Sequence, residues 1–256
     1  MLNFAANISM LYAELPMLER PAAAARDGFA GVEVQFPYEA SIAEWQAALH
    51  AANVPLVLLN APPGNMAQGE RGLAALPGRE SEFEDSLNQA FAYAKALNVP
   101  RVHVMAGTTP WESSARKTYL NNLRVAADAA RSQNLIVLIE PINTFDMPGY
   151  FLHDVHDALA VIDEVASNHL RLQLDFYHLH RILGEVRRGY EMCRYVVGHV
   201  QIAGFPGRHE PDIGEIDYAC VFKALMRDGY DGWIGAEYRP RHATSAGLGW
   251  RSLLVA

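Results

Sequence analysis

The chain has 256 residues, half of them hydrophobic and a fifth charged, as expected of a soluble protein with a large core. Its formal net charge of −8 argues against nucleic-acid binding as a main role, because contact with the phosphate backbone needs a positive face. Cys193 and Cys220 lack CxxC spacing, so they predict neither a disulfide framework nor a thiolate zinc site.

Nothing in the sequence indicates a membrane. No apolar run approaches the roughly 20 residues that span a bilayer. The N-terminal segment MLNFAANISMLYAEL has no basic stretch followed by a long apolar core, so it does not resemble a signal peptide. We therefore expect a cytoplasmic protein.

Apolar runs typical of buried strands alternate with amphipathic, helix-like segments along the whole chain. The strands are expected at residues 2–8, 32–36, 55–60, 101–106, 135–140, 171–175, 197–202 and 233–237. The helices are expected at 15–27, 41–52, 80–97, 113–133, 154–166, 180–193, 217–228 and 245–254. Ser41 and Glu44 form the capping-box pattern of a helix start.

Two segments depart from this regular pattern. The helix at 180–193 is expected to be weak, because Gly184 and Gly189 interrupt it. Residues 61–79 are rich in Gly and Pro, and a loop of this length in a compact domain is usually functional. We interpret it as a lid that closes over a substrate.

Eight strands that alternate with eight helices predict parallel βαβ units. The count of eight and the chain length favour a closed (β/α)8 TIM barrel over an open sheet. We see no linker or change of composition. The prediction is one barrel domain over residues 1–256.

Polar residues recur where the predicted strands end. They are Asn60, His103, Glu140, Asp175, Gln201 and Glu237. The last four offer side-chain oxygens, which are the ligands that Mg²⁺ and Mn²⁺ prefer. Three acids at one barrel face would repel each other without a cation. We therefore predict a divalent metal site at Glu140, Asp175, Gln201 and Glu237.

Glu140 and Glu237 follow the fifth and eighth strands, so they would flank a ligand rather than touch each other. Two such carboxylates can remove and return a proton through an enediolate. A metal ion would polarise the neighbouring carbonyl. This combination predicts aldose–ketose isomerisation.

Further residues of the same face are candidates for substrate binding. His178 follows Asp175 by three residues, and its alternative role is to start a helix or orient a ligand. Arg208 presents a planar fork for a substrate carboxylate, and its alternative is an ion pair with Glu210 or Asp212. His103 and Asn60 would line the pocket floor, with ordinary buried hydrogen bonding as their alternative. His199 is interpreted as a satisfied core residue.

These motifs resemble the hydroxypyruvate isomerase family of xylose-isomerase-like barrels, which includes 2-oxo-tetronate isomerases. The resemblance rests on segments spread over nearly the whole chain: NFAANISMLY, VEVQFPYE, AQGERGLAALPGRE, IEPIN, LQLDFYH, HVQIAGFPGRHEPDIGEIDY and GWIGAEYRP. It implies the same four metal ligands, Glu140 and Glu237 as the proton-transferring pair, and interconversion of hydroxypyruvate with tartronate semialdehyde.

Several alternatives remain open at this point. HVMAG and QIAGFPGRHEPD look closer to the four-carbon 2-oxo-tetronate branch, whereas EPINTFDMPGYF looks closer to the hydroxypyruvate branch. A sugar epimerase or dehydratase would share the acids. An endonuclease-IV-like phosphodiesterase would need many His ligands, and a barrel that only binds sugar acids would not need both carboxylates. The expected partners are a small sugar acid and, in a homo-oligomer, further copies of the chain.

Overall fold

The computed structural model describes residues 2–254, and the eight strands within them follow one another in the order of a closed barrel. The strands are β1 (Asn3–Asn7), β2 (Gly31–Val34), β3 (Leu56–Asn60), β4 (Arg101–His103), β5 (Ile136–Ile139), β6 (Leu170–Asp175), β7 (Val197–Ile202) and β8 (Trp233–Ala236). Every predicted strand is present, and the predicted TIM barrel is confirmed. None of the described helices is long and apolar enough to cross a membrane.

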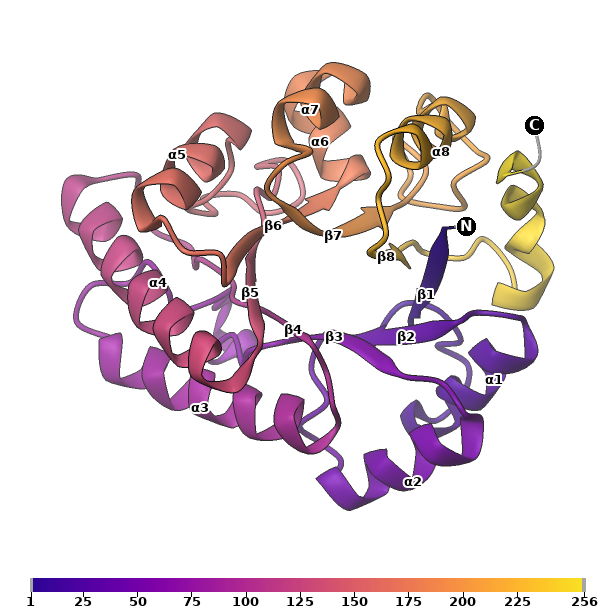
Figure 1. Cartoon of the computed structure of the whole chain (residues 1–256), viewed down its shortest axis with the longest axis horizontal. Coiled ribbons are helices and arrows are strands. Elements are labelled where there is room, and N and C mark those ends of the chain that lie inside the picture. The colour runs from indigo at the N-terminus through magenta and orange to yellow at the C-terminus, as the bar shows by residue number, and fades with distance from the viewer. Residues whose placement is uncertain (1, 255–256) are drawn as a thin grey trace. The chain divides into compact units, whose positions relative to one another are not determined.

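The helices follow the strands along the chain (Figure 1). They are α1 (Arg20–Arg26), α2 (Ile42–Ala52), α3 (Glu80–Ala96), α4 (Ser113–Gln133), α5 (Val155–Val165), α6 (Phe176–Leu183), α7 (Val186–Cys193) and α8 (Tyr218–Arg227). Short 3₁₀ segments lie at η1 (Met17–Glu19), η2 (Met66–Gln68) and η3 (Thr244–Leu254). The last predicted helix is therefore a run of 3₁₀ turns.

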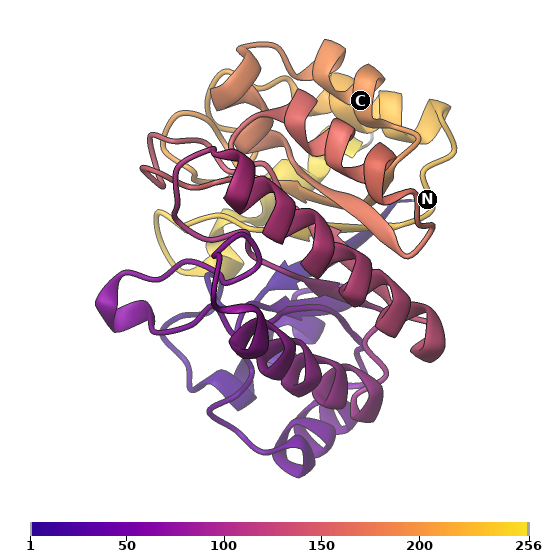
Figure 2. The same cartoon turned by 90° about the vertical axis from the view of Figure 1, so that its left-hand side faces the viewer.

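The chain forms two compact units. Unit 1 comprises Met1–Val57, Asp175–Met192 and His199–Ala256, and unit 2 comprises Leu58–Leu174 and Cys193–Gly198. In unit 1, β1 pairs in parallel with both β2 and β8, and β7 pairs in parallel with β8. In unit 2, parallel pairs join β3 to β4, β4 to β5 and β5 to β6. Helices α3 and α4 of unit 2 lie side by side (Figures 1 and 2).

Unbroken apolar runs become strands because both of their faces are buried. In β5, Val137, Leu138 and Ile139 are all fully buried. Local chemistry sets where helices begin: the predicted capping box of Ser41 and Glu44 opens α2. The loop at 61–79 holds only the short turn η2, and its role as a lid stays a prediction.

The segment after β6 differs from its prediction. Helix α6 begins directly at Phe176, because the Asp175 carboxylate accepts a hydrogen bond from the Tyr177 N–H and caps it. It ends at Gly184, whose φ of +72° is the left-handed conformation that terminates helices. Gly189 does not interrupt α7. A side chain there would meet Leu179, so this glycine allows α7 to approach α6 closely.

Candidate active site

Unit 1 brings together three of the predicted metal ligands. Asp175 ends β6, Gln201 lies in β7, and Glu237 directly follows β8. All three side chains are buried. The Gln201 amide donates a hydrogen bond to a Glu237 oxygen, and Arg208 donates to oxygens of both Asp175 (3.0 Å) and Glu237 (2.9 Å). The structure therefore brings these three strand-end side chains together, and their role as metal ligands stays a prediction.

A fourth acid of unit 1, Glu33 of β2, was not among the predicted site residues. Its side chain is fully buried. Its carboxylate accepts hydrogen bonds from Asn7 (2.9 Å), His199 (2.6 Å) and Gln201 (2.7 Å). The interpretation of His199 as a core residue is confirmed by its full burial, and its Nε2 bonds to this carboxylate, whereas its Nδ1 has no hydrogen-bond partner among the described residues. Glu33 thus joins side chains from β1 and β7 into one polar network.

Arg208 contacts carboxylates that the sequence did not pair with it. The expected alternative, an ion pair with Glu210 or Asp212, is absent among the described ion pairs. Arg208 instead reaches Asp175 and Glu237. Its backbone has a φ of +54°, an uncommon left-handed conformation for a side chain of this size. The guanidinium also lies 5.1 Å from the centre of the Tyr177 ring. These contacts hold the arginine at the acidic cluster.

Burial perturbs the acids of this cluster. Burial raises the pKa of Glu237 to about 8, with Asp175 and Glu33 raising it further and Arg208 opposing the shift. Burial also raises the pKa of Asp175, again against the effect of Arg208. Each carboxylate resists ionisation because others lie nearby in a site poor in water. A divalent cation would relieve this repulsion, so the donor set suits one.

The orientation of the Gln201 side chain also suits a divalent cation. Its amide nitrogen donates to Glu33 and to Glu237, which uses both of its N–H hydrogens. The acceptor atom of this side chain is Oε1, and an amide oxygen is a ligand that hard cations accept. Gln35 of unit 1 also donates to Glu237, over 3.1 Å. Glu237 is therefore held by side chains from two further segments.

Unit 2 holds the predicted site residues Asn60, His103 and Glu140. Glu140 follows β5 and is buried, and Gln173 of β6 donates a hydrogen bond of 2.9 Å to its Oε2. The His103 ring nitrogen Nε2 lies 3.8 Å from the same oxygen. Asn60 is the strand partner of His103 in the β3–β4 pair. The structure therefore gathers these polar residues at the ends of neighbouring strands.

His178 lies in the first turn of α6 and belongs to unit 1. Its Nε2 is 3.7 Å from Asp175 Oδ2, and its side chain is buried. Because Asp175 caps this helix, the cap itself places the imidazole on the side of the carboxylate. A buried imidazole beside a carboxylate can bind a metal or donate to a substrate oxygen.

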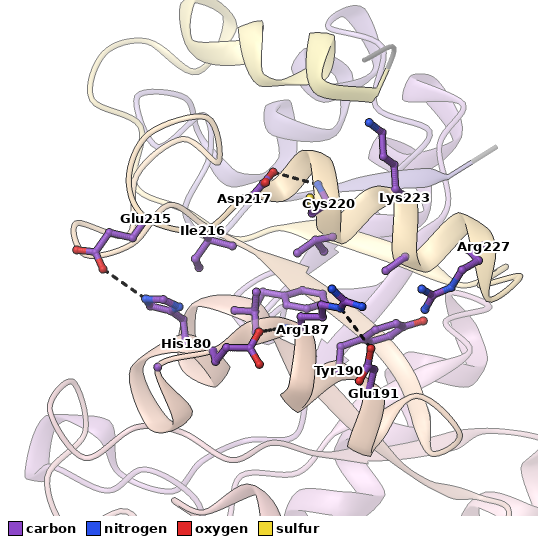
Figure 3. A pocket seen from close by; sticks show the side chains of 16 residues that line it. His180, Arg187, Tyr190, Glu191, Glu215, Ile216, Asp217, Cys220, Lys223 and Arg227 are labelled. Carbon is purple, nitrogen blue, oxygen red and sulfur yellow. Dashed lines mark hydrogen bonds and ion pairs between the residues drawn. The ribbon is translucent and has the colours of Figure 1, made fainter.

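A separate cavity of about 650 Å³ opens in unit 1 between α6, α7 and α8 (Figure 3). It is lined by the apolar side chains of Phe176, Ile216 and Val221 and also by charged residues such as Arg187 and Glu191. A small polar acid needs several convergent polar partners. This cavity lacks the acid and amide set of the strand ends, so we do not assign chemistry to it.

The residues missed from sequence had a weak signal. Glu33 stands in VEVQF as the polar member of an alternating strand, which is also the pattern of a half-exposed strand. Gln173 stands two residues before Asp175, hence on the same side of β6. That spacing could have identified Gln173. The partners of Glu33 at His199 and Gln201 are more than 160 positions away in sequence, and no local pattern connects them.

Comparison with known proteins finds relatives that match nearly the whole chain. A family profile described as xylose isomerase-like TIM barrel matches residues 21–253. The chain is 51% identical to the 2-oxo-tetronate isomerase of Cupriavidus necator over 97% of this chain and 96% of the relative. It is 42% identical to the hydroxypyruvate isomerase of Escherichia coli K12, over 98% of each. A crystal structure named AP endonuclease, family 2, from Brucella melitensis is 42% identical and superimposes with a TM-score of 0.96 over 98% of each chain.

Proposed function

Because this chain belongs to the xylose isomerase-like TIM barrel family, as one of its isomerases, we propose that it interconverts hydroxypyruvate and tartronate semialdehyde. The observation that carries the proposal is the near full-length identity to two sugar-acid isomerases, in a chain that keeps an acid after both β5 and β8. Hydroxypyruvate has a carbonyl carbon beside a hydroxymethyl carbon, which is the arrangement that an aldose–ketose isomerase needs.

Glu140 and Glu237 are the proposed proton-transferring pair. One carboxylate takes a proton from C3 of hydroxypyruvate, which leaves an enediolate. The other delivers a proton to C2, and the hydroxyl proton moves between the two oxygens. Support comes from the strand order: in a parallel barrel the residues after β5 and β8 belong to the same, C-terminal face. The raised pKa of Glu237 suits a group that alternately holds and releases a proton near neutral pH.

Glu140, Asp175, Gln201 and Glu237 are the proposed ligands of a divalent ion, Mg²⁺ or Mn²⁺. When bound, such an ion polarises the substrate carbonyl and stabilises negative charge on its oxygen. Within unit 1, the buried side chains of Asp175 and His178 lie close together and have the chemistry to hold a metal ion. This supports a metal and adds His178 as a further candidate ligand. The oxygen-rich donor set favours a hard ion over zinc.

The substrate carboxylate is assigned to Arg208. A guanidinium binds a carboxylate through two parallel hydrogen bonds, and Arg208 is held at the acids by its contacts with Asp175 and Glu237. We further propose that His178, His103 and Asn60 donate to or accept from the remaining substrate oxygens. The proposal also includes a cytoplasmic location and no nucleic-acid or membrane partner; a homo-oligomer is compatible with it.

A four-carbon 2-oxo acid is the second candidate substrate. It is favoured by the 51% identity to the Cupriavidus relative, against 42% for the hydroxypyruvate isomerase. The reaction type and the acids would stay the same, and only the room beyond C3 would differ. The name of the Brucella structure suggests phosphodiester chemistry, but a net charge of −8 is unfavourable for a DNA substrate, so we do not adopt it. A sugar epimerase or dehydratase stays a less favoured alternative.

The test is a side-by-side assay of the purified protein with hydroxypyruvate and 2-oxo-tetronate, each before and after treatment with EDTA. We expect isomerisation of hydroxypyruvate that EDTA abolishes and added Mg²⁺ or Mn²⁺ restores. A kcat/KM at least tenfold higher for 2-oxo-tetronate would assign the chain to the second candidate. Full activity after thorough metal removal would overturn the metal ligands, and inactivity on both acids would refute the proposed function.

A further inference from the structure

Glu33 lies in a site built to hold a carboxylate. The side chain is fully buried, and three donors from β1 and β7 converge on it: Asn7 and Gln201 on Oε1, and His199 on Oε2. The opposite wall is the backbone of Gly235 in β8. A Cβ atom at Gly235 would lie only 2.3 Å from Oε2 and 2.5 Å from Oε1. The absence of a side chain at this one position therefore makes room for the carboxylate.

The donors are themselves held in place. Asn7 uses its side-chain oxygen to accept the Ser9 N–H at 3.1 Å, so its NH₂ group points toward Glu33. His199 is fully buried, which fixes its ring. A carboxylate is acceptor-only, so it can receive all three hydrogen bonds without a mismatch. Buried polar groups are costly unless they find partners, and here donors from β1 and β7 meet the Glu33 carboxylate of β2.

The contact that matters for function is the one to Gln201. With one N–H on Glu33 and the other on Glu237, the amide cannot rotate by 180° without turning its oxygen toward two carboxylates. The amide oxygen of Gln201 would then face the carboxylate oxygens of Glu33 and Glu237, and none of these atoms could donate a hydrogen bond. Glu33 and Glu237 together therefore select one of the two amide orientations, the one whose NH₂ faces the acids.

We infer that Glu33 is a positioning residue that orients Gln201 so that its Oε1 serves as the ligand of the divalent ion. This inference rests on the metal site of the proposed function. Glu33 does not contact substrate in this scheme and acts only through Gln201. Partners that orient a metal ligand typically change metal affinity by about 10- to 100-fold when removed.

The experiment measures Mn²⁺ affinity directly, from the electron paramagnetic resonance signal of free Mn²⁺ during titration of the metal-free protein. Glu33→Ala removes all three acceptor contacts and is expected to weaken Mn²⁺ binding by about 10- to 100-fold. Glu33→Asp retracts the carboxylate by one methylene and should likewise weaken Mn²⁺ binding. It serves as the second variant if the alanine variant does not fold.

Glu33→Gln is the matched conservative variant. Its amide oxygen can replace Oε1 and accept from Asn7 and Gln201. Its NH₂ group can donate to His199, because the imidazole can shift its proton to the other nitrogen. We expect Mn²⁺ affinity within about threefold of the wild type. Val221→Ala, in the wall of the separate cavity, controls for general loss of stability and should leave Mn²⁺ affinity unchanged.

The outcomes separate the two proposals. Wild-type binding together with equally tight binding by folded Glu33→Ala would overturn the positioning role and leave the metal site standing. A loss of Mn²⁺ affinity in Glu33→Gln as large as that in Glu33→Ala would also contradict the positioning role. An equal loss for Val221→Ala would attribute the effect to stability alone. If the wild type binds no divalent ion, both the positioning role and the proposed metal site fail.

Discussion

Gly235→Ala is expected to act on the protein almost entirely through Glu33. The backbone at Gly235 does not have the left-handed φ that only glycine adopts readily, so β8 can accept alanine. The new Cβ would instead lie 2.3 Å from Glu33 Oε2, whereas ordinary contacts begin at 3.4 Å. The carboxylate must move by roughly 1 Å, which is enough to lengthen hydrogen bonds beyond their usual range.

The size of the effect follows from the hydrogen bonds at risk. Three donors, at 2.9, 2.6 and 2.7 Å, depend on this carboxylate. A hydrogen bond to a charged group contributes about 1.5–3 kcal/mol. Partial loss of all three should lower the free energy of unfolding by about 3–5 kcal/mol. Alanine has less conformational freedom in the unfolded chain, which offsets this by less than about 1 kcal/mol.

A double-mutant cycle in urea isolates this contact. In the Glu33→Ala background the carboxylate is gone, so the methyl group at residue 235 should fit at a cost of less than about 1 kcal/mol. The coupling energy between the two sites should therefore be about 2 kcal/mol or more. Gly249→Ala is the control, because its nearest neighbour would lie at an ordinary 3.8 Å. If Gly235→Ala lowered the free energy of unfolding equally in both backgrounds, the proposed packing of the Glu33 carboxylate against Gly235 would be refuted.

Four further variants test other parts of the description. Glu140→Gln and Glu237→Gln should each lower kcat by at least about 100-fold while circular dichroism shows an intact fold, because each removes a proton-transferring group; near-normal turnover in either would rule out the two-carboxylate mechanism. Arg208→Lys should raise KM about tenfold, since an ammonium cannot form the paired hydrogen bonds of a guanidinium, and an unchanged KM would place the substrate carboxylate elsewhere. Ser41→Ala should lower the free energy of unfolding by about 1 kcal/mol without changing kcat/KM, because it removes the exposed cap of α2, whose hydroxyl bonds to Glu44 rather than to the acids of the site; a loss of activity would contradict this account.

The sequence predicted the elements well wherever a local cause sets them. The strand at 136–139 is apolar on both faces, and the residue after it is the acid that the site needs. The starts of α2, α5 and α8 coincide with side chains that cap them, Ser41, Asp154 and Asp217, and the expected helices begin at these same residues. The sequence predicted one weak helix over residues 180–193 with interruptions at Gly184 and Gly189, and only the first interruption is present. Gly184 does end a helix, but Gly189 serves the packing of α7 against Leu179, which no local pattern reveals.

By itself, the sequence determined that there are eight parallel strands and that the last four carry oxygen-bearing side chains at their ends, because hydrophobic periodicity and strand ends are local properties. Tertiary structure alone decided which polar groups meet. Arg208 pairs with Asp175 and Glu237 rather than with its acidic neighbours in the loop, since the fold brings those strand ends to it. Glu33 became the centre of a network because β1, β7 and β8 place three donors and one bare glycine around it. Hydrogen bonds are short-ranged and directional, so the partners of a buried carboxylate are known only when the strands are in place.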